Sequence, residues 1–340
     1  MKSIVYELTS AQCLSQRDVI LDVGQLPPGT LFAETQYSAI STGTECAAWL
    51  GKPPLRPTAS IYPRLMGYCN LAKVVKVGAG VTEFREGDRI LTHQSHRSGF
   101  IIPTSEVLLR VNDSEPKLLK KLTATYLYHL GFNALQQGDY RPGHHVAVVG
   151  MGTLGITTAS LLVALGALPF LFTRQIESMK AIASLRASSI FHKDSFDVAQ
   201  VSELSGMPGV DLVINTSNAW SDLLLSLRLC RKGATLVCLG FPGRGEAAPE
   251  FNPLDSQYFY DKQLTLKHSG YTPDLEAPPI DIRFTKKRNM SYLASLIRRG
   301  LLDPNEILSL TLPWTELAGA YQSLCERSGG SYSALLEWAV

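Results

Sequence analysis

Charge imbalance and long apolar runs are both missing from this 340-residue sequence. Its 32 basic and 30 acidic side chains leave a net charge of only +2, so we expect neither nucleic acid nor a membrane surface as a partner. The longest apolar stretches, such as Ala159–Leu168, are far shorter than the ~20 residues of a membrane-spanning helix. The N-terminal segment Met1–Ser10 has no long apolar core, so no secretory signal is expected.

Cysteine is scarce and scattered, and no two cysteines form a C-x-x-C pair. In a chain of this length that spacing argues against a disulfide framework, and most of the thiols are expected to be small core residues. A reducing cytoplasm is therefore the expected location. With 45% hydrophobic and 18% charged residues, the chain can bury a substantial core, and its length suggests two domains. The six cysteines are Cys13, Cys46, Cys69, Cys230, Cys238 and Cys325.

Residues 1–118 have the short apolar segments and the frequent glycine and proline of a β-rich domain. Turn-forming residues separate the segments at Pro27–Gly29, Gly78–Gly80 and Gly87–Asp88. This pattern predicts a first domain of short strands. The expected strands are Val19–Leu21, Leu31–Ala39, Leu71–Val77 and Arg89–Leu91.

Across residues 119–272 the pattern changes to apolar strands that alternate with helices. Val146–Gly150 is continuously apolar, which is typical of a strand buried on both faces. The alternation predicts a doubly wound parallel sheet. We expect strands also at Phe170–Thr173, Val210–Asn215, Ala234–Gly240 and Leu264–His268, and helices at Leu154–Leu165, Ile176–Leu185 and Leu223–Leu229.

The tail, residues 273–340, mixes both patterns. Helices are expected around Met290–Arg299 and Thr315–Cys325, followed by an apolar end at Ala334–Val340. We expect this tail to return to the first domain, so that the parallel-sheet domain is an insertion between residues 119 and 272.

A glycine motif opens the first helix of the parallel-sheet domain. Gly150, Gly152 and Gly155 form a G-x-G-x-x-G pattern directly after an apolar strand, which is the context that predicts a dinucleotide site. The first glycine permits a tight turn, the second lets the backbone approach the pyrophosphate, and the third allows close helix packing. The helix N-terminus, with Thr153 and Leu154, offers N–H groups to phosphate. The alternative is a glycine-rich turn in an unrelated α/β protein.

Cofactor choice depends on the end of the second strand of this domain, at Thr173–Arg174. An acidic residue about 20 residues after the glycine motif would bind the ribose hydroxyls of NAD. Arg174 stands there instead, and a guanidinium complements a 2′-phosphate, so we predict NADP(H). The alternative is that Arg174 is a solvated charge and that the enzyme uses NAD. Thr216 and Gly240, at the ends of two later strands, are further cofactor candidates.

Together these features resemble the medium-chain dehydrogenase/reductase superfamily over nearly the whole chain. Its weaker markers are Gly67–Tyr68, Val77–Gly78, Gly87–Arg89, Arg141–Gly143, Gly300–Pro304 and Ala320–Tyr321. The resemblance implies an α/β protein with a GroES-like β-rich catalytic domain, a Rossmann domain, and an active site in the cleft between them. It also implies a soluble NAD(P)-dependent oxidoreductase that acts on a small-molecule substrate.

The zinc ligands of this superfamily are absent. By resemblance, Ser41 replaces a ligand cysteine, Tyr68 replaces a histidine, and the third ligand falls near Thr125. Cys46 and Cys69 lie close by, but they do not complete a set of three or four nitrogen or sulfur ligands at family positions. The four-cysteine structural zinc loop is also missing. We therefore expect no metal.

A zinc-free enzyme needs another group to polarise a carbonyl oxygen, and four residues are the candidates. Tyr68 is the first, because it stands at a lost ligand position and its hydroxyl can donate; the alternative is a tyrosine that only fills the space. Ser41 would add a second hydroxyl. His129 could relay a proton near the nicotinamide or merely bond backbone in a helix. Glu45 could be a base or a helix-start carboxylate.

Two further histidines, His93 and His96, lie in a polar segment that reads as a solvated loop or as the rim of the cleft. The run Ser41–Glu45 with Gly67–Tyr68 looks most like a zinc-free branch that includes an enzyme oxidising the hydroxyethyl group of bacteriochlorophyllide. That substrate is not carried over.

The function expected from this sequence is NADP(H)-dependent interconversion of an alcohol and a ketone or aldehyde. One alternative is an enoyl or quinone reductase that reduces C=C, and another is a Rossmann-fold binding protein without catalysis. Family members commonly pair the last strand of the parallel sheet across a two-fold axis, so a homodimer is also expected.

Overall fold

The computed structural model describes residues 1–55, 61–270, 272, 284–326 and 330–338. Contacts divide the chain into two compact units, of which unit 1 combines Met1–Tyr126 with Pro273–Val340 and unit 2 is Leu127–Thr272. The domain boundaries expected at residues 118 and 272 stay a prediction. In the described ranges, no helix is both long enough and apolar enough to cross a membrane.

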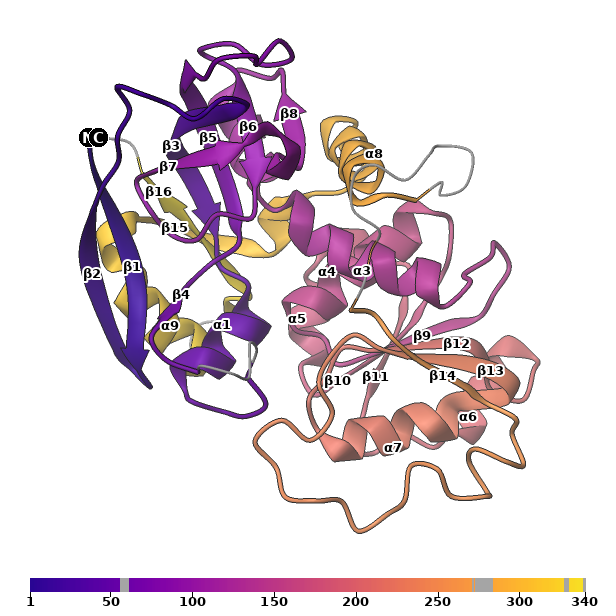
Figure 1. The fold of residues 1–340 in the computed structure, drawn as a ribbon. Helices are drawn as coiled ribbons and strands as arrows, with labels where there is room; N and C mark the ends of the chain where they lie inside the picture. The colour runs from indigo at the N-terminus through magenta and orange to yellow at the C-terminus, as the bar shows by residue number, and fades with distance from the viewer. Residues whose placement is uncertain (56–60, 271, 273–283, 327–329, 339–340) are drawn as a thin grey trace. The chain divides into compact units, whose positions relative to one another are not determined.

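Two sheets build unit 1, and their strands are antiparallel except for the parallel pair of β15 and β16 (Figure 1). The larger sheet has the order β15-β16-β3-β5-β6-β8, with β7 also paired to β3, and a smaller sheet has the order β2-β1-β4. Strand β16 pairs with β3, so the end of the chain joins a sheet that its first part builds. The strands are β1 Lys2–Ser10, β2 Cys13–Ile20, β3 Thr30–Ala39, β4 Arg64–Leu65, β5 Cys69–Val77, β6 Arg89–Thr92, β7 Gly99–Pro103, β8 Leu109–Val111, β15 Leu308–Pro313 and β16 Ser333–Glu337.

Helices α1 and α9 lie side by side in unit 1 and share an aromatic core (Figure 1). The rings of Trp49 on α1 and Tyr321 on α9 are 5.5 Å apart, and Trp314 stacks on Trp338 at 5.3 Å. Burial of such large rings stabilises the position of both helices. The helices are α1 Thr42–Trp49, α2 Pro116–Thr123, α8 Lys286–Arg298 and α9 Leu317–Glu326, with short 3₁₀ turns at Thr104–Glu106, Pro304–Glu306 and Trp314–Glu316.

Unit 2 is a doubly wound parallel sheet with the order β11-β10-β9-β12-β13-β14. Strands β9 and β10 are buried along their whole length, as their continuous apolar sequences predict. Helices α4 and α7 cover opposite faces of this sheet (Figure 1). The strands are β9 Val146–Val149, β10 Phe170–Thr173, β11 Ser189–His192, β12 Val210–Asn215, β13 Cys230–Cys238 and β14 Thr265–His268; the helices are α3 Thr125–Gln137, α4 Thr153–Ala164, α5 Ile176–Lys180, α6 Ala199–Ser205 and α7 Trp220–Leu229.

Several local predictions differ from the structure. The helix predicted at Ile176–Leu185 ends at Lys180, because Ile182 has an extended backbone (φ −76°, ψ 118°), and a 3₁₀ turn follows. Strand β13 begins at Cys230, four residues before the strand expected at Ala234–Gly240. The short strand β11 was not expected. Of the predicted apolar end, residues 339–340 lie outside the described residues.

Candidate functional site

The glycine motif follows the carboxyl end of β9 and begins α4, as predicted. Gly150 has a φ of +91°, a conformation that glycine adopts without strain. Gly152 is exposed and forms the N-cap of α4, and a Cβ added there would meet no protein atom within 4 Å. The N-terminal end of a long buried helix is thus presented by a loop that leaves space for a ligand, which fits a pyrophosphate.

Gly155 and Gly240 are required for close backbone packing around this loop. A Cβ on Gly155 would overlap Gly150 O, and a Cβ on Gly240 would overlap Ser217 O. Thr216 connects the loop to the end of β12, because its Oγ1 donates to Gly150 O at 2.5 Å and its backbone N to Val149 O at 2.9 Å. The predicted cofactor residues at the ends of β9, β12 and β13 therefore surround one loop, at the edge where doubly wound sheets bind ligands.

Arg174 lies where predicted, directly after β10, but it already has a partner. Its Nε donates to Asp194 Oδ2 at 2.6 Å and its Nη2 to Oδ1 at 3.3 Å. The two side chains are 62% and 46% exposed. Asp194 raises the pKa of Arg174, and Arg174 lowers the pKa of Asp194, mainly through this hydrogen bond. An exposed pair of this kind is weak, so Arg174 remains available to a phosphate.

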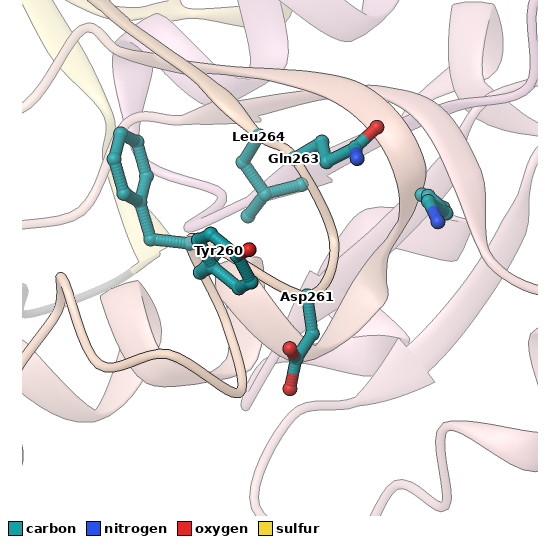
Figure 2. Close-up of a pocket in the computed structure, with 6 residues that line it drawn as sticks. Tyr260, Asp261, Gln263 and Leu264 are labelled. Carbon is teal, nitrogen blue, oxygen red and sulfur yellow. The ribbon is translucent and has the colours of Figure 1, made fainter.

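A surface hollow in unit 2 lies at the opposite ends of the parallel strands from the glycine motif. Its volume is about 530 Å³, and Tyr260, Asp261, Gln263 and Leu264 line it (Figure 2). These residues precede β14, whereas the glycine motif follows β9. Since parallel strands share one direction, the hollow is at their amino ends and does not belong to the dinucleotide site.

Ser41 and Tyr68, both in unit 1, form the hydroxyl pair that the sequence suggests. Ser41 is the N-cap of α1, and Tyr68 lies between β4 and β5. The two hydroxyls are joined by a short hydrogen bond, and Thr44 Oγ1 lies 3.5 Å from the Tyr68 hydroxyl. Ser41 is buried and Tyr68 is half-buried, so the tyrosine is the more accessible member of the pair.

Thr125 does not join this pair. Its Oγ1 donates to Leu122 O at 2.6 Å, one turn back along the chain. Thr125, the residue near the third replaced ligand position, is therefore not hydrogen-bonded to Ser41 or Tyr68, and Thr44 is the third hydroxyl next to the pair. Thr44 lies near Tyr68 because it is one turn of α1 after Ser41, on the side of Ser41 that faces Tyr68.

Burial strongly raises the pKa of Tyr68, and the neighbouring Cys69 and Glu45 add smaller effects in the same direction. Tyr68 thus keeps its proton at neutral pH and acts as a hydrogen-bond donor. Tyr126 packs edge-on against its ring at 5.7 Å, and His93 Nδ1 lies 3.3 Å from its carbonyl oxygen. Tyr126 was not a sequence candidate, since nothing in the local pattern distinguishes it.

Glu45 and His129 are both buried, with exposed fractions of 2% and 1%. Glu45 is in the first turn of α1, as a helix-start carboxylate would be, and its Oε1 accepts the Ser41 N–H at 2.6 Å. Its other oxygen meets His96, which is fully buried. The solvated-loop interpretation is therefore wrong for His96. His129 lies on α3 in unit 2.

Zinc does not fit the residues at the replaced ligand positions, because serine, tyrosine and threonine hydroxyls are poor zinc ligands beside cysteine and histidine. No group of three acidic, histidine or cysteine side chains able to hold a metal occurs among the described residues. A dinucleotide fits better, since the glycine loop offers a free helix N-terminus without a side chain in the way.

Residues 153–282 match the family described as zinc-binding dehydrogenase. The 2-desacetyl-2-hydroxyethyl bacteriochlorophyllide A dehydrogenase of Rhodobacter capsulatus is 27% identical over 332 residues, which cover 92% of this chain and 91% of that protein. The NADP-dependent alcohol dehydrogenase C 1 of Mycolicibacterium smegmatis is 27% identical over 260 residues, covering 63% and 70%. A dehydrogenase of Sinorhizobium meliloti solved bound to NADP has a TM-score of 0.74 at 18% identity, covering 99% of each chain.

The chain is similar to the medium-chain dehydrogenase/reductase superfamily over nearly its whole length. Its fold is the GroES-like and Rossmann combination that the resemblance implied. The relatives are named dehydrogenases, so the prediction of an NAD(P)-dependent enzyme is confirmed. At the coarse level, this protein is an alcohol dehydrogenase-like oxidoreductase.

Proposed function

We propose that this enzyme interconverts an alcohol and a ketone or aldehyde with NADP(H), and that it does so without a catalytic zinc. The observation that carries the proposal is the Ser41–Tyr68 hydroxyl pair at the positions of two replaced ligands. The relatives named as alcohol-oxidising enzymes favour C=O over C=C chemistry. We further propose a small-molecule substrate, a homodimer and a cytoplasmic location.

The pair has a proton to spare for a substrate. Two hydroxyls carry two protons, and the hydrogen bond between them uses one. In the structure the Tyr68 hydroxyl donates to Ser41 Oγ. For Tyr68 to donate to a bound carbonyl oxygen, both hydroxyls would rotate so that Ser41 donates to Tyr68. A hydroxyl that accepts one hydrogen bond becomes a better donor in the next. Tyr68 would then stabilise the negative charge that develops on that oxygen, which is the part a metal otherwise plays.

NADP(H) supplies the hydride when bound. This chain would hold it through the glycine loop of residues 150–155 and through Arg174, which could move from Asp194 to the 2′-phosphate. The NADP-dependent alcohol dehydrogenase C 1 of Mycolicibacterium smegmatis, to which this chain is similar, supports NADP(H) as the cofactor.

The test is a Tyr68→Phe variant assayed by NADPH oxidation with a panel of ketones, aldehydes and enones. We expect kcat to fall by roughly 10²–10³-fold, as loss of one oxyanion donor does, and the Kd for NADPH to stay unchanged. Product analysis separates the two reaction classes: an enone reduced at C=O gives an allylic alcohol. Wild-type turnover in Tyr68→Phe would remove the proposed donor, and a saturated ketone as the sole product would remove the reaction class.

A further inference from the structure

Glu45 is the centre of a buried hydrogen-bond network in unit 1. Its carboxylate accepts from three donors: the Ser41 N–H at 2.6 Å, His96 Nε2 at 2.9 Å and the Tyr321 hydroxyl at 2.5 Å. All three neighbours are donors, which suits a carboxylate that is only an acceptor. Leaving any of these contacts unmade in a buried site is costly. The network therefore holds α1, α9 and the segment between β6 and β7 in one arrangement.

His96 extends the network to β3 and to the segment that follows β16. Its Nδ1 lies 2.8 Å from Ser38 Oγ, and Trp338 Nε1 donates to the same oxygen at 2.8 Å. An indole N–H only donates, and the Ser38 oxygen can accept it while the Ser38 proton bonds Nδ1, which leaves the imidazole Nε2–H for Glu45. This arrangement of protons satisfies each partner in this chain of hydrogen bonds.

The same imidazole also supports the turn that carries Tyr68. Gly67 has a φ of +87°, and a Cβ added there would lie 2.6 Å from His96 Nε2. The His96 backbone N donates to Met66 O at 2.7 Å. The ring is therefore packed directly on the residue that precedes Tyr68. One buried side chain reaches Tyr68 through this turn and Ser41 through Glu45.

We propose that His96, Glu45 and Tyr321 form a positioning network that sets the distance between the Ser41 and Tyr68 hydroxyls, the function that a bound metal fulfils where ligands converge on it. This inference rests on the proposed function, because it assigns the hydroxyl pair to the reaction. None of the three residues touches substrate. Each acts through Ser41 or Tyr68, and small misplacements of reacting groups can cost about 10²-fold in rate.

Tyr321→Phe is the sharpest test, because it removes one donor to Glu45 and keeps the ring that packs on Trp49. Tyr6→Phe is the matched control: Tyr6 is a buried tyrosine of the same core whose hydroxyl bonds Trp314 O and Gln16, outside the network. We expect kcat of Tyr321→Phe to fall between about tenfold and 100-fold with KM nearly unchanged, and kcat of Tyr6→Phe to match wild type. Equal kcat values for the two variants, in an enzyme whose kcat does fall in Tyr68→Phe, would overturn the inference.

His96→Gln and His96→Leu add a rescue test that a merely structural role would not pass. The Gln amide can donate to Glu45 where Nε2–H does, whereas Leu cannot, so His96→Gln should keep several-fold more activity than His96→Leu at equal thermal stability. Equal activity in the two soluble variants would count against the network.

A readout without catalysis separates this inference from the proposed function. Crystal structures of Tyr321→Phe and Tyr6→Phe give the Tyr68 Oη–Ser41 Oγ distance directly. A longer distance in Tyr321→Phe alone supports the network even if Tyr68→Phe shows wild-type turnover, in which case only the proposed function fails. An unchanged distance in both variants overturns the network.

Discussion

Exchanging Arg174 for glutamate should reverse the cofactor preference of this enzyme. Arg174 follows β10, and its guanidinium already binds Asp194 through two hydrogen bonds. A 2′-phosphate must therefore compete with a carboxylate for the same donors. The outcome depends on which acceptor gives the stronger interaction at an exposed position.

The phosphate should win this competition. The Arg174–Asp194 pair is exposed on both sides, and such pairs contribute little because water and salt screen them. A phosphate carries up to two charges and three acceptor oxygens, and a charge-assisted bond from Arg174 is worth about 1.5–3 kcal/mol, or roughly 10- to 150-fold in affinity. We therefore expect NADPH to bind at least several-fold more tightly than NADH in the wild-type enzyme.

Fluorescence titration of both nucleotides against three proteins tests the reasoning. Wild type should prefer NADPH, Arg174→Glu should prefer NADH, and Asp194→Asn should bind NADPH slightly more tightly, because the competing carboxylate is gone. The wild-type preference should weaken with added salt. Equal Kd values for NADH and NADPH in wild type would show that Arg174 is only a surface charge. A large loss of NADH affinity in Asp194→Asn would instead show that Asp194 binds the ribose hydroxyls.

Four other outcomes are expected. Elemental analysis should find no zinc in the purified enzyme, and chelators should leave turnover unchanged; one equivalent of zinc per chain would contradict this. Light scattering at micromolar concentration should give a dimer, and Leu266→Lys, at the exposed edge strand β14, should give monomers; a wild-type monomer refutes the proposed assembly. Gly152→Ala should keep the wild-type Tm but lose NADPH affinity, whereas Gly155→Ala should lower stability by about 1–3 kcal/mol through overlap with backbone; similar Tm losses in both would contradict this difference. Burial raises the pKa of Tyr68 above its ordinary value near 10, so the folded state holds that proton more tightly than the unfolded chain. The contribution of Tyr68 to stability is therefore complete below about pH 10 and is lost above it. A Tyr68-dependent loss of kcat between pH 7 and 9 would contradict the raised pKa.

The dinucleotide loop could be predicted from the sequence because its determinants are local. Gly150, Gly152 and Gly155 lie within six consecutive positions after one apolar strand. Gly150 has a positive φ, Gly155 packs against backbone, and Gly152 leaves open space for a ligand. A continuous apolar run likewise marks β9 without information from elsewhere in the chain. Local signals of this kind can be recognised in a single sequence.

The network around Glu45 could not be predicted in the same way. His96 is 51 residues from Glu45 in the sequence and Tyr321 is 276 residues away. The packing of α9 on α1 brings Tyr321 to Glu45, and backbone hydrogen bonds of His96 with Met66 and Tyr6 hold the imidazole there. Local composition even pointed the wrong way for His96, because its polar neighbours resemble a solvated loop. For Arg174, the sequence located the residue but not its partner Asp194, which follows a different strand.

Charge explains why the thiol beside Tyr68 is a poor substitute for the missing metal ligands. Burial raises the pKa of Cys69 well above its ordinary value, and the negative charge of Glu45 raises it further. A zinc site needs the thiolate, so any metal there would have to displace a tightly held proton beside the negative charge of Glu45. Glu45, in turn, has its charge met by three hydrogen-bond donors. The surroundings of Ser41 and Tyr68 thus favour neutral hydroxyl and thiol groups, which is the arrangement that carbonyl polarisation by hydrogen bonding requires.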